Sequence, residues 1–286
     1  MNWVCIDGCF VPSDEAKISV FDHGFLYGDG LFETMRAYKG KIFALAEHLQ
    51  RLRQGAAVLR LKIPFTDTEL AKLLADTISR NNLPEAYIRL SFSRGSGPIG
   101  VDPALCLNGT LVIMAKAPAD STLVYEEGIN LGICPVRRNH SLALPPAIKS
   151  MNFLNNILAK IWAKESGYAE ALMLSAEGWV TETTVSNIFF IKAGQVFTPG
   201  ERAGILAGVT KKYVIRVLSE MKIPCTEGLY SESELKKADE IFLTNSGSEV
   251  IPVVTLDGAQ IGNGKPGELT GRIHRSLRLS IEKNIR

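Results

Sequence analysis

AIKSMNFLNNILAKIWA, residues 147–163, is the stretch on which the interpretation of this chain depends. Its second half has the pattern of an amphipathic helix, because apolar side chains recur in adjacent pairs every four residues and so share one face. These side chains are Phe153, Leu154, Ile157, Leu158, Ile161 and Trp162. We expect this face to be buried.

Lys149 lies just before this helix and follows the Pro145-Pro146 pair, which blocks a helix. Burial beside apolar side chains disfavours the charged amine and lowers its pKa. A lysine so placed can act as a nucleophile and form an imine with an aldehyde. The alternative is a solvated lysine whose aliphatic stem lies along the helix, and the spacing alone leaves both readings open.

The string IKSMNFLNN closely resembles the lysine segment of the fold-type IV pyridoxal-phosphate (PLP) enzymes. This family contains branched-chain aminotransferases, D-amino-acid aminotransferases and 4-amino-4-deoxychorismate lyases. The resemblance implies that Lys149 is the catalytic residue, that PLP is the cofactor, and that a second subunit completes the active site of a homodimer. It also implies an α/β fold of the α+β type with two domains, like that of the D-amino acid aminotransferases.

The polar, turn-forming segment PADST, residues 118–122, is the expected interdomain linker. It would separate a smaller N-terminal α/β domain, residues 1–117, from a larger C-terminal domain, residues 123–286, that carries the PLP lysine.

Composition favours a globular protein with a small-molecule substrate. The chain has 286 residues, is 46% hydrophobic and has a net charge of +2, which gives no electrostatic case for nucleic acid or an anionic membrane. No signal peptide and no run of about 18 apolar residues is present, so we expect a cytoplasmic protein. The 5 cysteines are scattered and lack metal-ligand spacing, which favours reduced thiols and no metal site.

Several short segments predict local structure. Asp7-Gly8 between two apolar runs is typical of a two-residue hairpin turn. Residues 45–61 have helical periodicity. Thr66-x-x-Glu69 and Ser231-x-x-Glu234 are capping boxes that predict helix starts.

Further segments resemble motifs of the same family and occur in the family's order. YGDGLFETMR, which begins at Tyr27, is similar to a strand that lines the active site. In EHLQRL, Arg51 matches an arginine that clamps the cofactor phosphate, for which a guanidinium supplies two parallel hydrogen bonds. In TETTVSNIFF, Glu182 matches the glutamate that pairs with the pyridine nitrogen, and protonation there makes the cofactor an electron sink.

Two more motifs concern anions. Gly208-Val209-Thr210 resembles a phosphate site at a helix start, with Lys211 in place of the usual arginine. NSGSEV resembles the turn that binds phosphate and the substrate carboxylate. The resemblance assigns cofactor contacts to Arg51, Lys149, Glu182, Ser186, Asn187, Val209, Thr210 and Ser246, and substrate contacts to Tyr27, Phe32, Tyr87, Arg89, Gly247 and Ser248.

The resemblance implies transamination between an amino acid and a 2-oxo acid. Tyr87-x-Arg89 places both side chains on one strand face, and with the GPIGVDP loop it favours a branched-chain L-amino acid and 2-oxoglutarate. Phe153 departs from the tyrosine usual in branched-chain enzymes. The alternatives are a D-amino-acid aminotransferase, a 4-amino-4-deoxychorismate lyase, against which Glu33 argues, and a non-catalytic PLP-binding protein.

Overall fold

The computed structural model describes residues 2–285, whose contacts divide into two compact units. Unit 1 contains the chain up to Ala119, the segment Ile148–Phe153 and the last residues from Asn284. Unit 2 contains Asp120–Ala147 and Leu154–Lys283. The first division therefore falls within the expected linker. Lys149, by contrast, belongs to unit 1, whereas the sequence interpretation placed it in the C-terminal domain.

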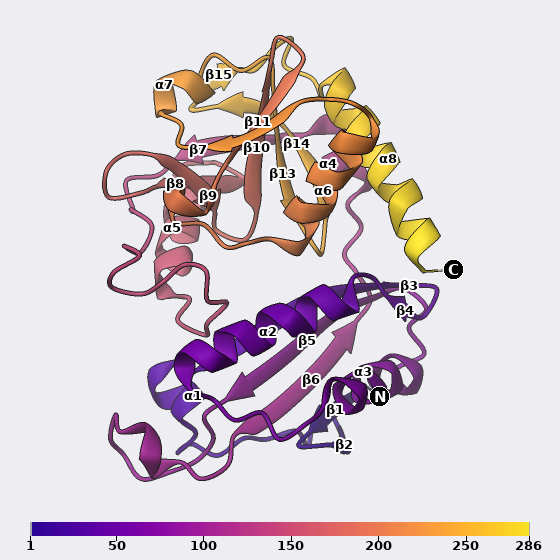
Figure 1. Cartoon of the computed structure of the whole chain (residues 1–286), viewed down its shortest axis with the longest axis vertical. Helices are drawn as coiled ribbons and strands as arrows, with labels where there is room; N and C mark the ends of the chain where they lie inside the picture. The colour runs from indigo at the N-terminus through magenta and orange to yellow at the C-terminus, as the bar shows by residue number, and fades with distance from the viewer. Residues whose placement is uncertain (1, 286) are drawn as a thin grey trace. The chain divides into compact units, whose positions relative to one another are not determined.

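Unit 1 is built on a six-stranded sheet with the order β2-β1-β6-β5-β3-β4 (Figure 1). Its strands are β1 (Trp3–Ile6), β2 (Cys9–Pro12), β3 (Gly30–Tyr38), β4 (Lys41–Ile42), β5 (Ala86–Ser93) and β6 (Thr110–Lys116). Its helices are α1 (His23–Tyr27), α2 (Leu45–Leu59), α3 (Asp67–Arg80) and the short 3-10 helix η1 (Pro103–Leu105).

The core of unit 1 lies where α2 and α3 pack on the sheet. Leu49 and Leu52 of α2 and Leu70 and Leu74 of α3 join alternate residues of β3, β5 and β6, such as Ile88, in one buried cluster. The two-residue repeat of a strand sends the intervening side chains to the opposite face of the sheet.

The local predictions in this unit are confirmed. β1 and β2 pair antiparallel around Asp7 and Gly8, which both adopt positive φ as the tight turn requires. Thr66 and Glu69 form a complete capping box at the start of α3. The helix predicted over residues 45–61 is α2.

Unit 2 contains a nine-stranded sheet that closes on itself. The order is β12-β11-β10-β13-β14-β7-β8-β9, and β9 pairs with β10 to complete a ring of six strands. The strands are β7 (Ile129–Ile133), β8 (Glu170–Leu174), β9 (Val180–Thr183), β10 (Asn187–Lys192), β11 (Gln195–Pro199), β12 (Cys225–Gly228), β13 (Glu240–Asn245), β14 (Glu249–Leu256) and β15 (Ala259–Gln260), which pairs with β14. The closed ring encloses apolar side chains such as Leu172, Ile188 and Leu243.

The helices of unit 2 lie outside this ring (Figure 1). They are α4 (Thr122–Glu127), α5 (Leu154–Glu165), the 3-10 helix η2 (Glu201–Ala203), α6 (Val209–Glu220), α7 (Glu232–Leu235) and α8 (Glu268–Asn284). The second predicted capping box, between Ser231 and Glu234, opens α7 and is confirmed.

The prediction that the apolar face of residues 153–162 is buried is wrong for the single chain. Leu154 is 67% exposed, and Ile157, Leu158 and Ile161 are each close to half exposed. Helix α5 instead packs on β8 through its opposite face, where the buried residues are Asn156, Ala159 and Ala163. Small side chains allow the close helix-to-strand approach, and the larger apolar residues project away.

Among the residues that the structure describes, no helix is long and apolar enough to cross a bilayer. Over the same range, no cluster of three or more histidine, cysteine, aspartate or glutamate side chains could hold a metal ion. All five cysteines are free thiols.

Candidate active site

The backbone of the lysine segment extends the sheet of unit 1. The Phe32 amide donates to the Lys149 carbonyl at 3.0 Å, and the Met151 amide donates to the Gly30 carbonyl at 2.9 Å. Leu31 and Ser150 form an isolated bridge between them. These main-chain bonds hold Lys149 beside the first residues of β3, which explains why it belongs to unit 1.

The Phe32 ring collects the side chains around Lys149. The Lys149 Nζ lies 4.5 Å from the ring centroid, and the Arg89 guanidinium carbon lies 3.9 Å from it. Phe153 packs edge-on against the same ring, with 5.3 Å between centroids. Phe32 itself is only 4% exposed. The lysine amine thus lies against an apolar, aromatic surface, the environment expected of a nucleophilic lysine.

Arg89 and Tyr87 share the face of β5 that points away from α2 and α3. Tyr87 is the register partner of Arg36, and Arg89 is the partner of Thr34. Burial lowers the pKa of Arg89, although the neighbouring Tyr87 opposes this shift. The structure confirms that the two residues lie on one strand face.

On the opposite face of the sheet, which α2 covers, Glu33 forms a buried ion cluster with two residues of α2. Arg51 donates to both carboxylate oxygens, at 2.8 Å from Nε and 2.6 Å from Nη2, and His48 Nδ1 donates at 2.7 Å. Burial would raise the pKa of Glu33, but the charge and hydrogen bonds of Arg51 and the bond from His48 lower it to about 2. Glu33 therefore fixes the orientation of the Arg51 guanidinium.

In unit 2, Glu182 is a second buried carboxylate with several donors. Arg138 Nη2 donates to Oε1 at 2.7 Å, while the Asn187 side chain and the Leu206 amide each donate to Oε2 at 3.1 Å. Arg138 also donates to Asn156 of α5 at 3.1 Å. Donors of this kind favour the ionised carboxylate. Such a group can hold a protonated ring nitrogen.

The start of α6 has the properties of an anion site. Gly208 is the N-cap residue and supplies no side-chain cap, so the helix dipole and first-turn amides, those of Val209 and Thr210 among them, suit an anion. A Cβ on Gly208 would lie 1.9 Å from the Asn187 Oδ1. Glycine is therefore required for the close approach of the helix start to Asn187. The Lys211 side chain does not point its charge at this anion site, because its Nζ donates to the Pro199 carbonyl and the Glu227 carboxylate.

The turn between β13 and β14 carries the remaining predicted residues. Asn245 Oδ1 accepts hydrogen bonds from the Gly247 amide at 2.8 Å and the Ser248 amide at 2.7 Å. Asn245 Nδ2 donates to the Ser186 hydroxyl at 2.8 Å. The two turn amides therefore converge on one oxygen atom, which in this chain belongs to Asn245.

Residues 30–256 match the family model described as Amino-transferase class IV. The chain belongs to the class IV aminotransferase family.

Relatives of this class IV aminotransferase agree along its whole length. It is 41% identical over 275 residues to a putative branched-chain-amino-acid aminotransferase of Methanocaldococcus jannaschii, covering 96% of this chain and 95% of the relative. It is 34% identical to a D-alanine aminotransferase of Staphylococcus haemolyticus, covering 99% of each chain. The crystal structure of a branched-chain amino acid aminotransferase of Escherichia coli matches with a TM-score of 0.95 and 29% identity, covering 100% of this chain and 96% of that one.

The cofactor is evident from related crystal structures. Two structures of a branched-chain amino acid aminotransferase match this chain with TM-scores of 0.93 and 30% identity, and they cover 99% of it. One is complexed with N-(5'-phosphopyridoxyl)-L-glutamate and the other with pyridoxamine 5'-phosphate. Both compounds are derivatives of PLP, so this class IV aminotransferase is a PLP-dependent enzyme.

The residues predicted for the site fall into two groups in this class IV aminotransferase. Unit 1 carries Tyr27, Phe32, Arg51, Tyr87, Arg89 and Lys149, and unit 2 carries Glu182, Ser186, Asn187, Val209, Thr210, Ser246, Gly247 and Ser248. Within unit 1, Phe32, Arg89 and Lys149 lie together. The Tyr27 hydroxyl instead accepts a bond from the Gly100 amide at 3.0 Å. Within unit 2, Glu182 and Asn187 are in contact.

Sequence reasoning missed Arg138 as a site residue. It holds Glu182 and lines a pocket of about 160 Å³ in unit 2 together with Trp179 and Arg202. Arg138 and Glu182 are 44 positions apart, so no local pattern links them. His48 was also missed, and its place in EHLQRL was the available signal.

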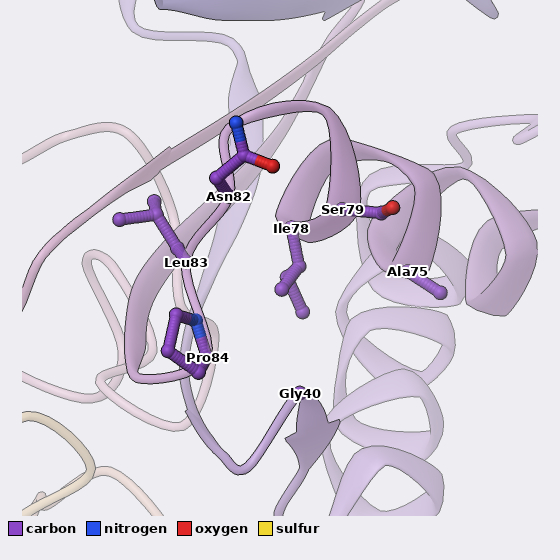
Figure 2. Close-up of a pocket in the computed structure, with 7 residues that line it drawn as sticks. All are labelled: Gly40, Ala75, Ile78, Ser79, Asn82, Leu83 and Pro84. Carbon is purple, nitrogen blue, oxygen red and sulfur yellow. The ribbon is translucent and has the colours of Figure 1, made fainter.

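A larger pocket of about 460 Å³ lies in unit 1 at the end of α3 (Figure 2). It is lined by Gly40, Ala75, Ile78, Ser79, Asn82, Leu83 and Pro84. Its lining contains no charged side chain and none of the predicted site residues. We therefore assign it no part in the chemistry.

Proposed function

We propose that this class IV aminotransferase uses PLP to transfer the amino group of a branched-chain L-amino acid to 2-oxoglutarate. The observation that carries the proposal is the position of Lys149, whose amine lies on the Phe32 ring, which Arg89 also contacts. The donor set also suits the cofactor, since unit 2 offers a buried carboxylate for a ring nitrogen and an uncapped helix start for a phosphate. When bound, PLP stabilises negative charge that develops on the substrate Cα.

The side chains of this chain then have distinct tasks. Lys149 Nζ would hold the cofactor and, when free, would move the proton at the substrate Cα. Glu182, held by Arg138 and Asn187, would pair with the cofactor ring nitrogen and favour its protonation. The amides of Val209 and Thr210, with Ser246 and Arg51, bind the phosphate.

The proposed substrate rests on the side chains near Lys149 and on the relatives. Phe32 offers aromatic surface that suits leucine, isoleucine and valine, and Arg89 adds a cation over the same ring. The Methanocaldococcus jannaschii and Escherichia coli relatives are named as branched-chain enzymes. The D-alanine aminotransferase relative supports D-amino acids as the second candidate.

We further propose that the enzyme acts as a homodimer. Two exposed apolar surfaces support a second copy as the partner: Leu154, Ile157, Leu158 and Ile161 on α5, and Phe21 and Phe25 around α1. Large contiguous apolar patches on a protein surface mark interaction sites. A monomer with full activity would refute this proposal, and sedimentation at assay concentrations would detect it.

A panel of L- and D-amino acids tests the activity. The visible spectrum of the cofactor reports each half-reaction, because accepting an amino group converts PLP to pyridoxamine phosphate. L-Leucine should convert it, L-alanine should react more slowly because a methylene in an apolar pocket contributes roughly 1 to 3 kcal/mol, and D-alanine should leave it unchanged. Conversion by D-alanine but not L-leucine would support the D-specific candidate instead.

A further inference from the structure

The three-residue turn Ser246–Ser248 ends at Glu249, which has an unusual backbone conformation. Asn245 and Glu249 are register partners at the ends of β13 and β14. Glu249 has φ of 57°, in the left-handed region where glycine is usual. A glutamate at a position that suits glycine indicates that its side chain is needed.

The side chain of Glu249 is clamped by helix α8. The residue is 2% exposed, and its carboxylate accepts bonds of 2.8 Å from His274 Nε2 and 2.8 Å from Arg278 Nε. Burial would raise the pKa of Glu249, but the bonds from His274 and Arg278 and the charge of Arg278 lower it to about 2. The carboxylate is therefore an anion at neutral pH and serves as a fixed anchor.

Helix α4 holds the same turn from a second direction. The Tyr125 hydroxyl donates to the Ser248 carbonyl at 3.0 Å, and the Tyr125 ring packs on His274 with 4.5 Å between centroids. Figure 1 shows α4 next to α8. The turn is thus tied through Ser248 and Glu249 to two helices, in addition to its internal bonds to Asn245.

We propose that the Glu249–His274–Arg278 cluster is a positioning device that keeps the Gly247 and Ser248 amides convergent for the substrate carboxylate. The inference rests on the proposed function, in which these amides bind that carboxylate. The Asn245 side chain accepts from both amides in this structure, so a substrate oxygen must take its place. When Asn245 leaves, the clamp on Glu249 and the bond from Tyr125 retain the shape of the turn.

The test uses the holoenzyme with two variants and a control. Glu249→Gly suits the left-handed backbone and removes the clamp, while Arg278→Met removes one donor whose side chain is 54% exposed. Arg275→Met, at an exposed site on the same helix, is the matched control. Both test variants should raise KM for L-leucine about tenfold, with kcat nearly unchanged. This change corresponds to the loss of one charged hydrogen bond. Amide hydrogen exchange at Gly247 and Ser248 should become faster, and Arg275→Met should match the wild type.

Unchanged KM and unchanged exchange at Gly247 and Ser248 in the two variants would overturn the proposal. If Glu249→Gly does not fold, Arg278→Met decides alone. If the wild type transaminates no amino acid, the proposed function fails, yet hydrogen exchange still shows whether the clamp orders the turn. A purely structural role would change the thermal midpoint without separating KM from kcat.

Discussion

Glu33→Gln measures how much the buried ion cluster contributes to folding. The pKa of Glu33 is about 2 in the fold against an ordinary 4.5. Each tenfold change in the proton-binding constant corresponds to roughly 1.4 kcal/mol, so this difference in pKa corresponds to about 3 kcal/mol of stabilisation at pH 7. A lowered pKa stabilises the fold fully above pH 4.5, and the stabilisation is lost as the pH falls towards 2. At about pH 3, roughly 1 kcal/mol of this stabilisation of the fold should remain.

Urea denaturation of wild type and Glu33→Gln at about pH 7 and about pH 3 gives the two differences in free energy of unfolding. Glu15→Gln, at an exposed position in unit 1, serves as the control and should cost little at either pH. An equal loss at both pH values would show that Gln disturbs packing and that the ion cluster is not the cause. A loss below about 1 kcal/mol at neutral pH would refute the calculation itself.

Three substitutions test the cofactor contacts. Arg51→Ala should raise the PLP dissociation constant roughly 10- to 150-fold, since a charged phosphate contact contributes roughly 1.5 to 3 kcal/mol; equilibrium dialysis of folded protein measures it. Glu182→Ala should retain PLP but slow proton abstraction from the substrate in stopped-flow spectra, and identical defects in both variants would contradict the separate roles. Gly208→Ala should weaken PLP binding and displace Asn187, because the new Cβ would meet its Oδ1 at 1.9 Å; unchanged binding would show that the helix start is not the phosphate site.

Features set by neighbouring residues could be predicted from the sequence. The capping boxes at Thr66 and Ser231 and the hairpin at Asp7-Gly8 depend on side chains within a few positions, so their chemistry is visible locally. The shared face of Tyr87 and Arg89 follows from the two-residue repeat of a strand.

Features that depend on contacts between residues far apart in the sequence could not be predicted from it. The apolar stripe of α5 predicted the wrong buried face, because α5 packs on β8 through the face that carries Asn156, Ala159 and Ala163. The grouping of Lys149 with unit 1 depends on main-chain bonds to β3. Arg138 reaches Glu182 only through the fold, because the two residues are 44 positions apart in the sequence.

The role of Lys149 can be tested by locating the cofactor on the chain. Borohydride reduction of the holoenzyme, followed by proteolysis and mass spectrometry, fixes the covalent attachment between PLP and a lysine. We expect a phosphopyridoxyl group on Lys149, and Lys149→Ala should remove both the label and the transamination. Label on another lysine, or a fully labelled Lys149→Ala protein, would contradict it.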